Sequence, residues 1–103
     1  MINNLIYEFM AEIDLPIPFS QEFISLIPRQ RAVTDRLMKE KVITSYAVSI
    51  EDGKLWTTIM ADSEDSAINI LSQFPIIEMT EYRIFKLAFH NVPGSVLPQF
   101  SLN

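Results

Sequence analysis

Two carboxylates of this chain have the residue type and spacing for proton transfer. Glu8 and Glu12 stand four residues apart in a stretch whose apolar residues alternate, so they share one face of a predicted strand. Four residues of strand span ~13 Å, which excludes a carboxylate dyad within one chain. Either glutamate can act alone as a base if the apolar side chains of Met10 and Trp56 raise its pKa. The alternative is that each lines a wet interior or pairs with Lys86 or an arginine.

His90 is the only histidine in the sequence and closes the last predicted strand. That strand runs antiparallel to the first, so we expect His90 to come near Glu8 at the start of the first strand. A carboxylate–imidazole pair is suited to carrying one proton. The alternative is a strand-end histidine that bonds to backbone near a subunit contact.

A hairpin predicted over residues 44–62 organises the chain around these groups. Two runs of β-branched and aromatic residues flank Asp52-Gly53, a strong signal for a two-residue turn. Such a turn places Ser49 opposite Trp56. One face of the hairpin is then a good core surface, and the other sets large side chains against small ones.

The face with large beside small side chains is predicted either to pack against another subunit or to line a ligand pocket. On it, Met60 lies opposite Ser45. Tyr82 is predicted to share a face with His90 and to offer its hydroxyl to a bound oxygen. The candidate ligand-contacting residues are Met10, Ser45, Ser49, Trp56, Met60 and Tyr82.

The remaining elements follow from apolar periodicity and helix caps. Alternation predicts a first strand over residues 5–15 and a last strand over residues 79–90. Ser20 and Ser63 are predicted to cap two helices. Pro28 lies inside the first helix, where we expect a kink or a break into a short and a longer helix.

The predicted order is βαββαβ, which describes an α+β protein with the ferredoxin-like fold. Two helices then cover one face of a four-stranded antiparallel sheet whose first strand is central. The uncovered face would carry Trp56, Met60, Ile84 and Ala88, and so apolar a face should not meet water alone. We therefore expect two copies to pack their sheets face to face as a dimeric α+β barrel.

The length of 103 residues fits one domain, with a barrel core over residues 1–90 and an apolar arm over residues 91–103 that lies across a neighbouring subunit. Thirteen acidic against eight basic residues give a net charge of −5, so we expect neither nucleic acid nor a membrane surface as partner. One histidine, no cysteine and two glycines exclude a zinc site and nucleotide-binding loops. No targeting or spanning stretch is recognised, so we expect a cytoplasmic protein.

Several short stretches along the chain follow one another in an order that can be compared with known families. Ile13–Pro16 ends the first predicted strand, and Leu87-Ala88 with His90 closes the last. Between them, the stretch 61–79 (ADSEDSAINILSQFPIIEM) combines an acidic-serine helix start, an Ile-Leu-Ser run and a proline after the helix. In this order the stretches resemble the muconolactone delta-isomerases and their relatives, small dimeric α+β barrel proteins.

The resemblance implies an isomerase that moves a proton within an unsaturated lactone during aromatic catabolism, without metal or organic cofactor. It also implies a homodimer that assembles further, often into decamers. Where the family presents a His, an Arg and an Asp inward from its first strand, this chain has Glu8, Met10 and Glu12. The missing arginine is the natural partner of a substrate carboxylate, which favours a relative with a different small-molecule ligand.

Three functions remain open on the sequence. The first is a cofactor-free isomerase with Glu8 or His90, and less directly Glu12, as proton carrier. The second is a non-catalytic barrel that binds a small apolar molecule or serves as an oligomerisation module, and the third is a cofactor-independent monooxygenase. An interior cavity that reaches Glu8 and His90 would favour an enzyme, and a filled interior would favour the structural role.

Overall fold

Four strands form one sheet, and both helices lie against the same face of it. The computed structural model describes residues 5–93. The elements in chain order are β1 (Tyr7–Asp14), α1 (Gln21–Lys39), β2 (Ile43–Ser49), β3 (Lys54–Ala61), α2 (Glu64–Leu71), the short 3-10 helix η1 (Ile77–Met79) and β4 (Glu81–Lys86). All neighbouring strands are antiparallel, in the order β2-β3-β1-β4. The expected α+β class, ferredoxin-like order and central first strand are confirmed.

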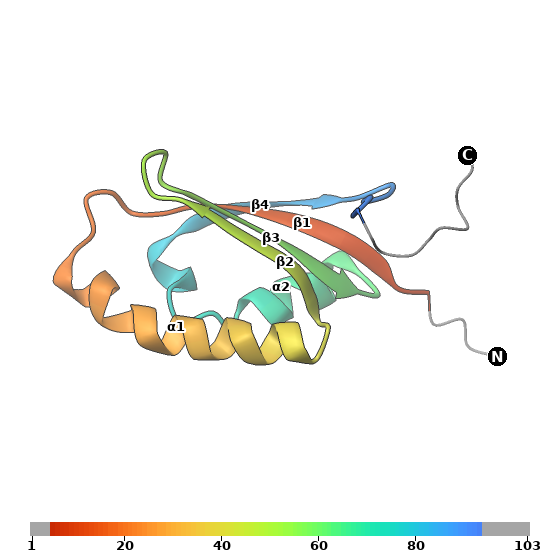
Figure 1. Cartoon of the computed structure of the whole chain (residues 1–103), viewed down its shortest axis with the longest axis horizontal. Coiled ribbons are helices and arrows are strands. Elements are labelled where there is room, and N and C mark those ends of the chain that lie inside the picture. Colours follow the sequence, from red (N-terminus) through yellow and green to blue (C-terminus); the bar gives the residue numbers. More distant parts are fainter. Residues whose placement is uncertain (1–4, 94–103) are drawn as a thin grey trace.

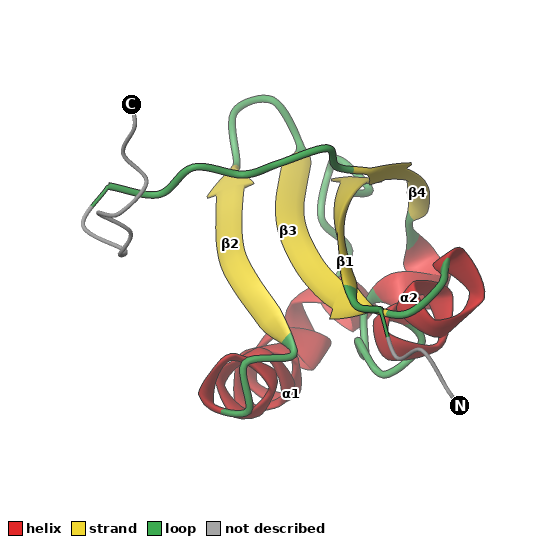
Figure 2. Ribbon diagram, turned by 90° about the vertical axis from the view of Figure 1, so that its right-hand side faces the viewer, coloured by secondary structure: helices red, strands yellow, loops and turns green. Residues whose placement is uncertain are grey.

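The core lies between the sheet and the helices, which Figure 1 shows beneath the sheet. Alternate residues of the central strands point into it, because side chains alternate across a strand. The buried apolar side chains include Phe9, Ala11, Ile13, Leu55 and Ile59 from the sheet and Phe23, Leu37, Ala67 and Leu71 from the helices. The opposite face of the sheet carries no helix (Figures 1 and 2) and is called the open face below.

Both predicted helix caps are confirmed. The Ser20 hydroxyl accepts a hydrogen bond from the Phe23 N–H at 3.1 Å, and the Ser63 hydroxyl accepts one from the Ser66 N–H at 3.1 Å. The first helix runs through Pro28 as one element, so the expectation of two successive helices is wrong.

The predicted register of the hairpin is wrong by two residues. Ser49 lies opposite Lys54 rather than Trp56, so the loop spans residues 50–53 instead of two residues. Trp56 lies opposite Ala47. A register shift of two residues preserves the alternation of side chains between the two faces. The side chains between the loop and the bulge in β2 therefore lie on the faces that were predicted for them.

The last strand is shorter than predicted and its open-face residues differ. It ends at Lys86, and Ile84 lies opposite the buried Ala11 and packs against the core. Arg83 and Phe85, opposite Glu12 and Met10, occupy the open face in its place. The expectation that Ile84 lies on the uncovered face is therefore wrong.

Neither helix within residues 5–93 combines the length and apolar character needed to cross a membrane. Most of the arm expected over residues 91–103 lies outside the described residues, including Val96, Leu97, Phe100 and Leu102.

Candidate functional site

The open face brings together most of the candidate catalytic and ligand-contacting residues that were predicted from the sequence. Glu8 lies opposite Met60, and Glu12 lies opposite Trp56, so the apolar side chains and the carboxylates share this surface. Met10, between the two glutamates, lies opposite Thr58. The open face thus has an apolar centre with an acidic group toward each end.

His90 reaches Glu8 because the chain crosses the open face after β4. The Leu87 N–H still donates to the Glu8 carbonyl at 2.9 Å, but regular pairing ends there. Figure 2 shows the following chain passing over the sheet from β4 toward β2, and we call residues 87–93 the crossing segment. His90 Nδ1 lies 3.0 Å from Glu8 Oε2, so the expected approach of these two side chains is confirmed.

This pair is partly shielded from solvent, with side-chain exposures of 27% for His90 and 18% for Glu8. A carboxylate only accepts hydrogen bonds, so the Nδ1 that faces it carries the proton. The acceptor lone pair of the imidazole is then on Nε2. This arrangement can take up a proton at Nε2 while the carboxylate holds the ring in place.

A second group holds Glu8, and the sequence did not point to it. The Thr44 hydroxyl donates to Glu8 Oε2 at 2.6 Å and lies 2.6 Å from Thr58 Oγ1, which is itself 2.6 Å from Ser45 Oγ. Each hydroxyl has one proton, and that of Thr44 goes to the carboxylate. Thr58 must then donate to Thr44, and Ser45 to Thr58. We call these three hydroxyls the hydroxyl row.

The pKa of Glu8 lies below its ordinary value of 4.5. Burial alone would raise this pKa, but it is outweighed by the hydrogen bonds from Thr44 and His90, by the charge that His90 carries when its imidazole is protonated, and by the nearby Thr58 hydroxyl. The condition under which Glu8 could act alone as a base, a pKa raised by apolar neighbours, is therefore not met, and Glu8 is held as a carboxylate.

Glu12 belongs to an ion-pair network rather than to the Glu8 group. Its carboxylate lies 2.8 Å from Arg83 Nη2 and 3.1 Å from Lys54 Nζ, and both cations also contact Asp14. The hydrogen bond from Lys54 is the main reason that the pKa of Glu12 is lowered, and Arg83 adds to it against the effect of burial. A carboxylate so neutralised is a poor base, and the expected alternative, pairing with an arginine, is confirmed.

Tyr82 does not lie where it was expected. It pairs with the buried Ile13 and packs against the core on the helical side of the sheet. Its hydroxyl is therefore separated by the sheet from the His90–Glu8 pair. The predicted face was wrong because both alternating sets of the last strand contain large apolar residues, and pairing with β1 turns the set with Tyr82 and Ile84 toward the helices.

The two serines on the open face have different surroundings. Ser45 begins the hydroxyl row that leads to Glu8, whereas Ser49 contacts Asp52 in the hairpin loop, with its hydroxyl donating to the carboxylate at 3.1 Å. Only Ser45 thus lies beside the His90–Glu8 pair. Within residues 5–93, no group of three or more histidine and acidic side chains gathers closely enough to hold a metal ion.

No protein-family model matches the chain, and no curated protein matches its sequence. The crystal structure of muconolactone isomerase matches with a TM-score of 0.67, at 16% identity over 87% of this chain and 95% of that chain. A conserved protein from Methanosarcina mazei Go1 matches at 20% identity over 80% of this chain and 92% of that chain, with a TM-score of 0.43, too low to indicate a common fold. At 16% identity, the likeness to muconolactone isomerase shows a shared fold alone.

Proposed function

We propose that the chain is a cofactor-free isomerase that moves a proton within a small unsaturated lactone or a related compound. The contact of 3.0 Å between His90 Nδ1 and Glu8 Oε2 carries this proposal. It is supported by the fold that the chain shares with muconolactone isomerase. The resemblance of stretches along the sequence to that family agrees with it.

In the proposed reaction, His90 is the catalytic base and Glu8 is a positioning residue. Nε2 of His90 removes a proton from a carbon next to the conjugated system of the lactone, and the electron pair moves toward the carbonyl oxygen. The same nitrogen returns the proton to another carbon of that system, so the double bond shifts and the composition is unchanged. Glu8 remains a carboxylate and stabilises the imidazolium that forms between the two steps.

The apolar centre of the open face supports a site closed by a second copy. Met10, Trp56 and Met60 are half-buried there, and the Phe85 side chain is 48% exposed beside them. An apolar surface of this kind favours contact with another protein surface over water. A homodimer that packs two open faces together would exclude water from the His90–Glu8 pair and strengthen its electrostatics.

The test is isomerisation of muconolactone and related butenolides in D₂O, followed by NMR as deuterium enters the substrate. We expect His90→Gln and Glu8→Gln each to lower kcat at least about 100-fold, as loss of a general base or its orientation does, with KM and oligomer size unchanged. Glu8→Gln should also change the pH profile of the residual rate. The matched control is Glu51→Gln in the exposed hairpin loop. Full turnover by His90→Gln would overturn the mechanism.

A second candidate function is a non-catalytic oligomerisation module. The observation that favours it is the neutralised network of Glu12, Asp14, Lys54 and Arg83, which suits an interface more than a reaction. This function predicts no lactone turnover by the unmodified protein, together with a stable oligomer. Deuterium incorporation that depends on His90 would exclude it as the whole function.

A further inference from the structure

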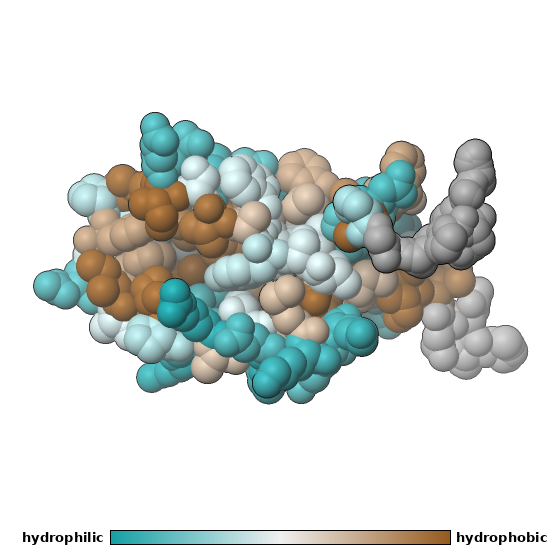
Figure 3. Space-filling model, viewed as in Figure 1, coloured by the Kyte–Doolittle hydropathy of each residue, from teal (hydrophilic) through white to brown (hydrophobic). Residues whose placement is uncertain are grey.

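A separate hollow lies on the helical side of the sheet, between α1 and the edge strand β2. It has a volume of about 370 Å³. Figure 3 shows apolar side chains gathered around it at the end of the molecule where β2 and β3 are joined. The hollow is on the opposite side of the sheet from the His90–Glu8 pair, so it is independent of the proposed isomerase site.

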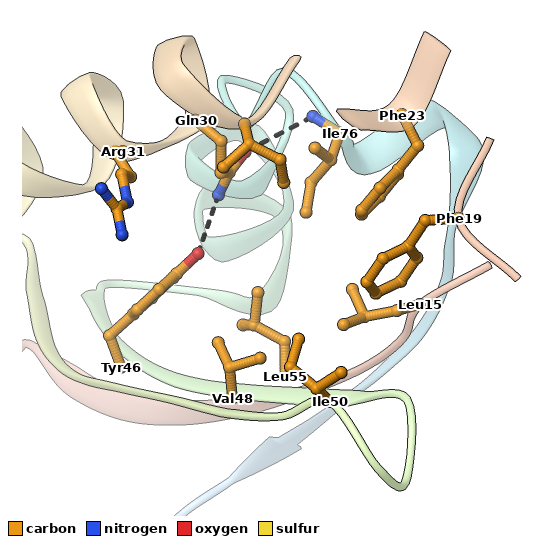
Figure 4. A pocket seen from close by; sticks show the side chains of 11 residues that line it. Leu15, Phe19, Phe23, Gln30, Arg31, Tyr46, Val48, Ile50, Leu55 and Ile76 are labelled. Atoms are coloured by element: carbon orange, nitrogen blue, oxygen red, sulfur yellow. Dashed lines mark hydrogen bonds between the residues drawn. The ribbon is translucent and has the colours of Figure 1, made fainter. Parts of the chain in front are cut away.

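Most of the hollow is lined by apolar and aromatic groups. The Phe19 and Phe23 rings stack with centroids 4.8 Å apart, and Figure 4 shows both beside Leu15 at one end. The apolar residues lining it are Leu15, Phe19, Phe23, Ile27, Val48, Ile50, Leu55 and Ile76. Such a wall favours a ligand with an apolar body.

Two polar groups are fixed at the other end. The Gln30 side chain, 3% exposed, donates to the Tyr46 hydroxyl at 3.3 Å and accepts from the Ile76 N–H at 3.4 Å. Both contacts are drawn in Figure 4. Burial raises the pKa of Tyr46 against the effect of its hydrogen bonds, so the phenol is neutral at physiological pH. Its hydroxyl is held by the side chains of Gln30 and Thr34, which fixes the polar end of the hollow.

Arg31 supplies a positive charge at this same end. Figure 4 shows its guanidinium on the side of the hollow where the Tyr46 hydroxyl lies. Within residues 5–93, no carboxylate forms an ion pair with Arg31, although Arg36, Lys54 and Arg83 all have acidic partners. A guanidinium is well suited to binding a carboxylate through two parallel hydrogen bonds.

We propose that this hollow binds a small apolar monocarboxylate, with its hydrocarbon body between the phenylalanines and β2 and its carboxylate at Arg31, at the end of the hollow where Tyr46 lies. The volume lies at the lower end of the roughly 300–1,000 Å³ typical of small-molecule sites. A single aromatic ring or a branched aliphatic chain with one carboxylate is therefore the fitting size. Neither His90 nor Glu8 takes part in this binding.

The test is titration of the full chain with 3-phenylpropionate, by calorimetry and by NMR of the backbone amides. We expect saturable binding that shifts the amide signals of Phe23 and Tyr46. Arg31→Gln should weaken binding about tenfold, as loss of a charge-assisted hydrogen bond does. The control is Arg29→Gln, an exposed arginine of the same helix that does not line the hollow, and it should bind as the unmodified protein does.

The neutral 3-phenylpropionamide separates charge recognition from apolar burial. We expect it to bind the unmodified protein about as weakly as the acid binds Arg31→Gln. Equal affinity for the acid and the amide, or equal weakening by Arg29→Gln and Arg31→Gln, would overturn the proposal, as would the absence of saturable binding. His90→Gln should bind the acid normally, so failure of the isomerase proposal and failure of this one are distinguishable.

Discussion

Thr44 and Ser45 are consecutive residues of β2, yet both hydroxyl oxygens lie 2.6 Å from Thr58 Oγ1. Successive side chains of a regular strand point to opposite faces. The shared contact arises because β2 has one extra residue between the pairs Ile43–Ile59 and Ser45–Thr58, a bulge that turns two neighbours to the same side. The bulge therefore creates the hydroxyl row that ends at Glu8.

Replacement of Thr44 by valine should raise the pKa of Glu8 and destabilise the protein. The valine removes the donor to Glu8 and the acceptor of the Thr58 proton, and Thr58 is fully buried. An unsatisfied buried hydroxyl costs about 1–3 kcal/mol. The pKa is measured by ¹³C NMR titration of the Glu8 carboxyl, and the free energy of unfolding by urea denaturation. Thr44→Ser keeps the hydroxyl and should change neither; an unchanged Glu8 pKa in Thr44→Val would contradict the role of the row.

Stability should fall in acid. The folded-state pKa values of Glu8, Glu12 and Asp14 all lie below the ordinary values of 4.5 and 3.8. At a pH between the lowered folded-state pKa values and the ordinary ones, the unfolded chain binds more protons than the folded one, so the free energy of unfolding rises with pH. The contribution is fully present above about pH 4.5 and is lost as pH falls through the lower folded-state values.

The acid effect is measured by urea unfolding between about pH 2.5 and pH 7. Lys54 is the main cause of the shift at Glu12 and Asp14, so Lys54→Met should flatten the curve. High salt should flatten it as well, since these groups are solvent-accessible and screened. A stability that is constant over the whole range would show that the network contributes nothing.

Phe85→Asp should dissociate the expected homodimer while the protomer stays folded. Phe85 lies on the open face opposite Met10 and is half exposed, so the protomer loses little core packing. A charge at the centre of an apolar interface should raise the dissociation constant at least about thirtyfold, the loss typical of a hot-spot residue. Sedimentation velocity measures the change. Ile24→Asp, on the exposed part of α1, is the control, and equal sedimentation of both variants would place the interface elsewhere.

Gly53→Ala should destabilise the hairpin tip by about 1–2 kcal/mol, the cost of a left-handed conformation for a residue with a side chain. Gly53 has a φ of +64°, and an added Cβ would lie 2.8 Å from Ile17 Cδ1. Its carbonyl also accepts from the Leu15 N–H at 2.9 Å, which ties the tip to the end of β1. The midpoint of urea denaturation measures the loss. Glu51→Ala in the same loop should leave the midpoint unchanged, and an equal effect of both variants would argue against backbone strain.

The faces of the sheet could be predicted from the sequence more reliably than its pairing. The hairpin register was wrong by two residues, but an even shift leaves Trp56 on the open face and Leu55 in the core. In the last strand both alternating sets contain large apolar residues, among them Ile84 and Phe85, so alternation gave no signal for which set is buried. The pairing of Ile84 with the buried Ala11 determines that the set with Ile84 faces the core.

The candidate site could be predicted only in part. Antiparallel topology predicts that the end of the last strand comes near Glu8, but the contact of His90 with Glu8 is made from the crossing segment, after β4 has ended at Lys86. The bulge at Thr44 has no signal in residue type, so the hydroxyls that lower the Glu8 pKa were missed. Contacts made by an irregular backbone cannot be deduced from periodicity.

The crossing segment also sets how closely a second sheet can approach. Sheets that pack face to face are ~10 Å apart, with interdigitated side chains filling the space between them. The crossing segment lies over the end of the open face that holds Glu8 (Figure 2), and its Phe89 side chain is 77% exposed. It would hold a second sheet away from that end. Twin sheets would then touch where Trp56 lies and diverge toward His90. In such a dimer the gap between the two sheets would be a wedge, and its wide end would hold the His90 imidazole.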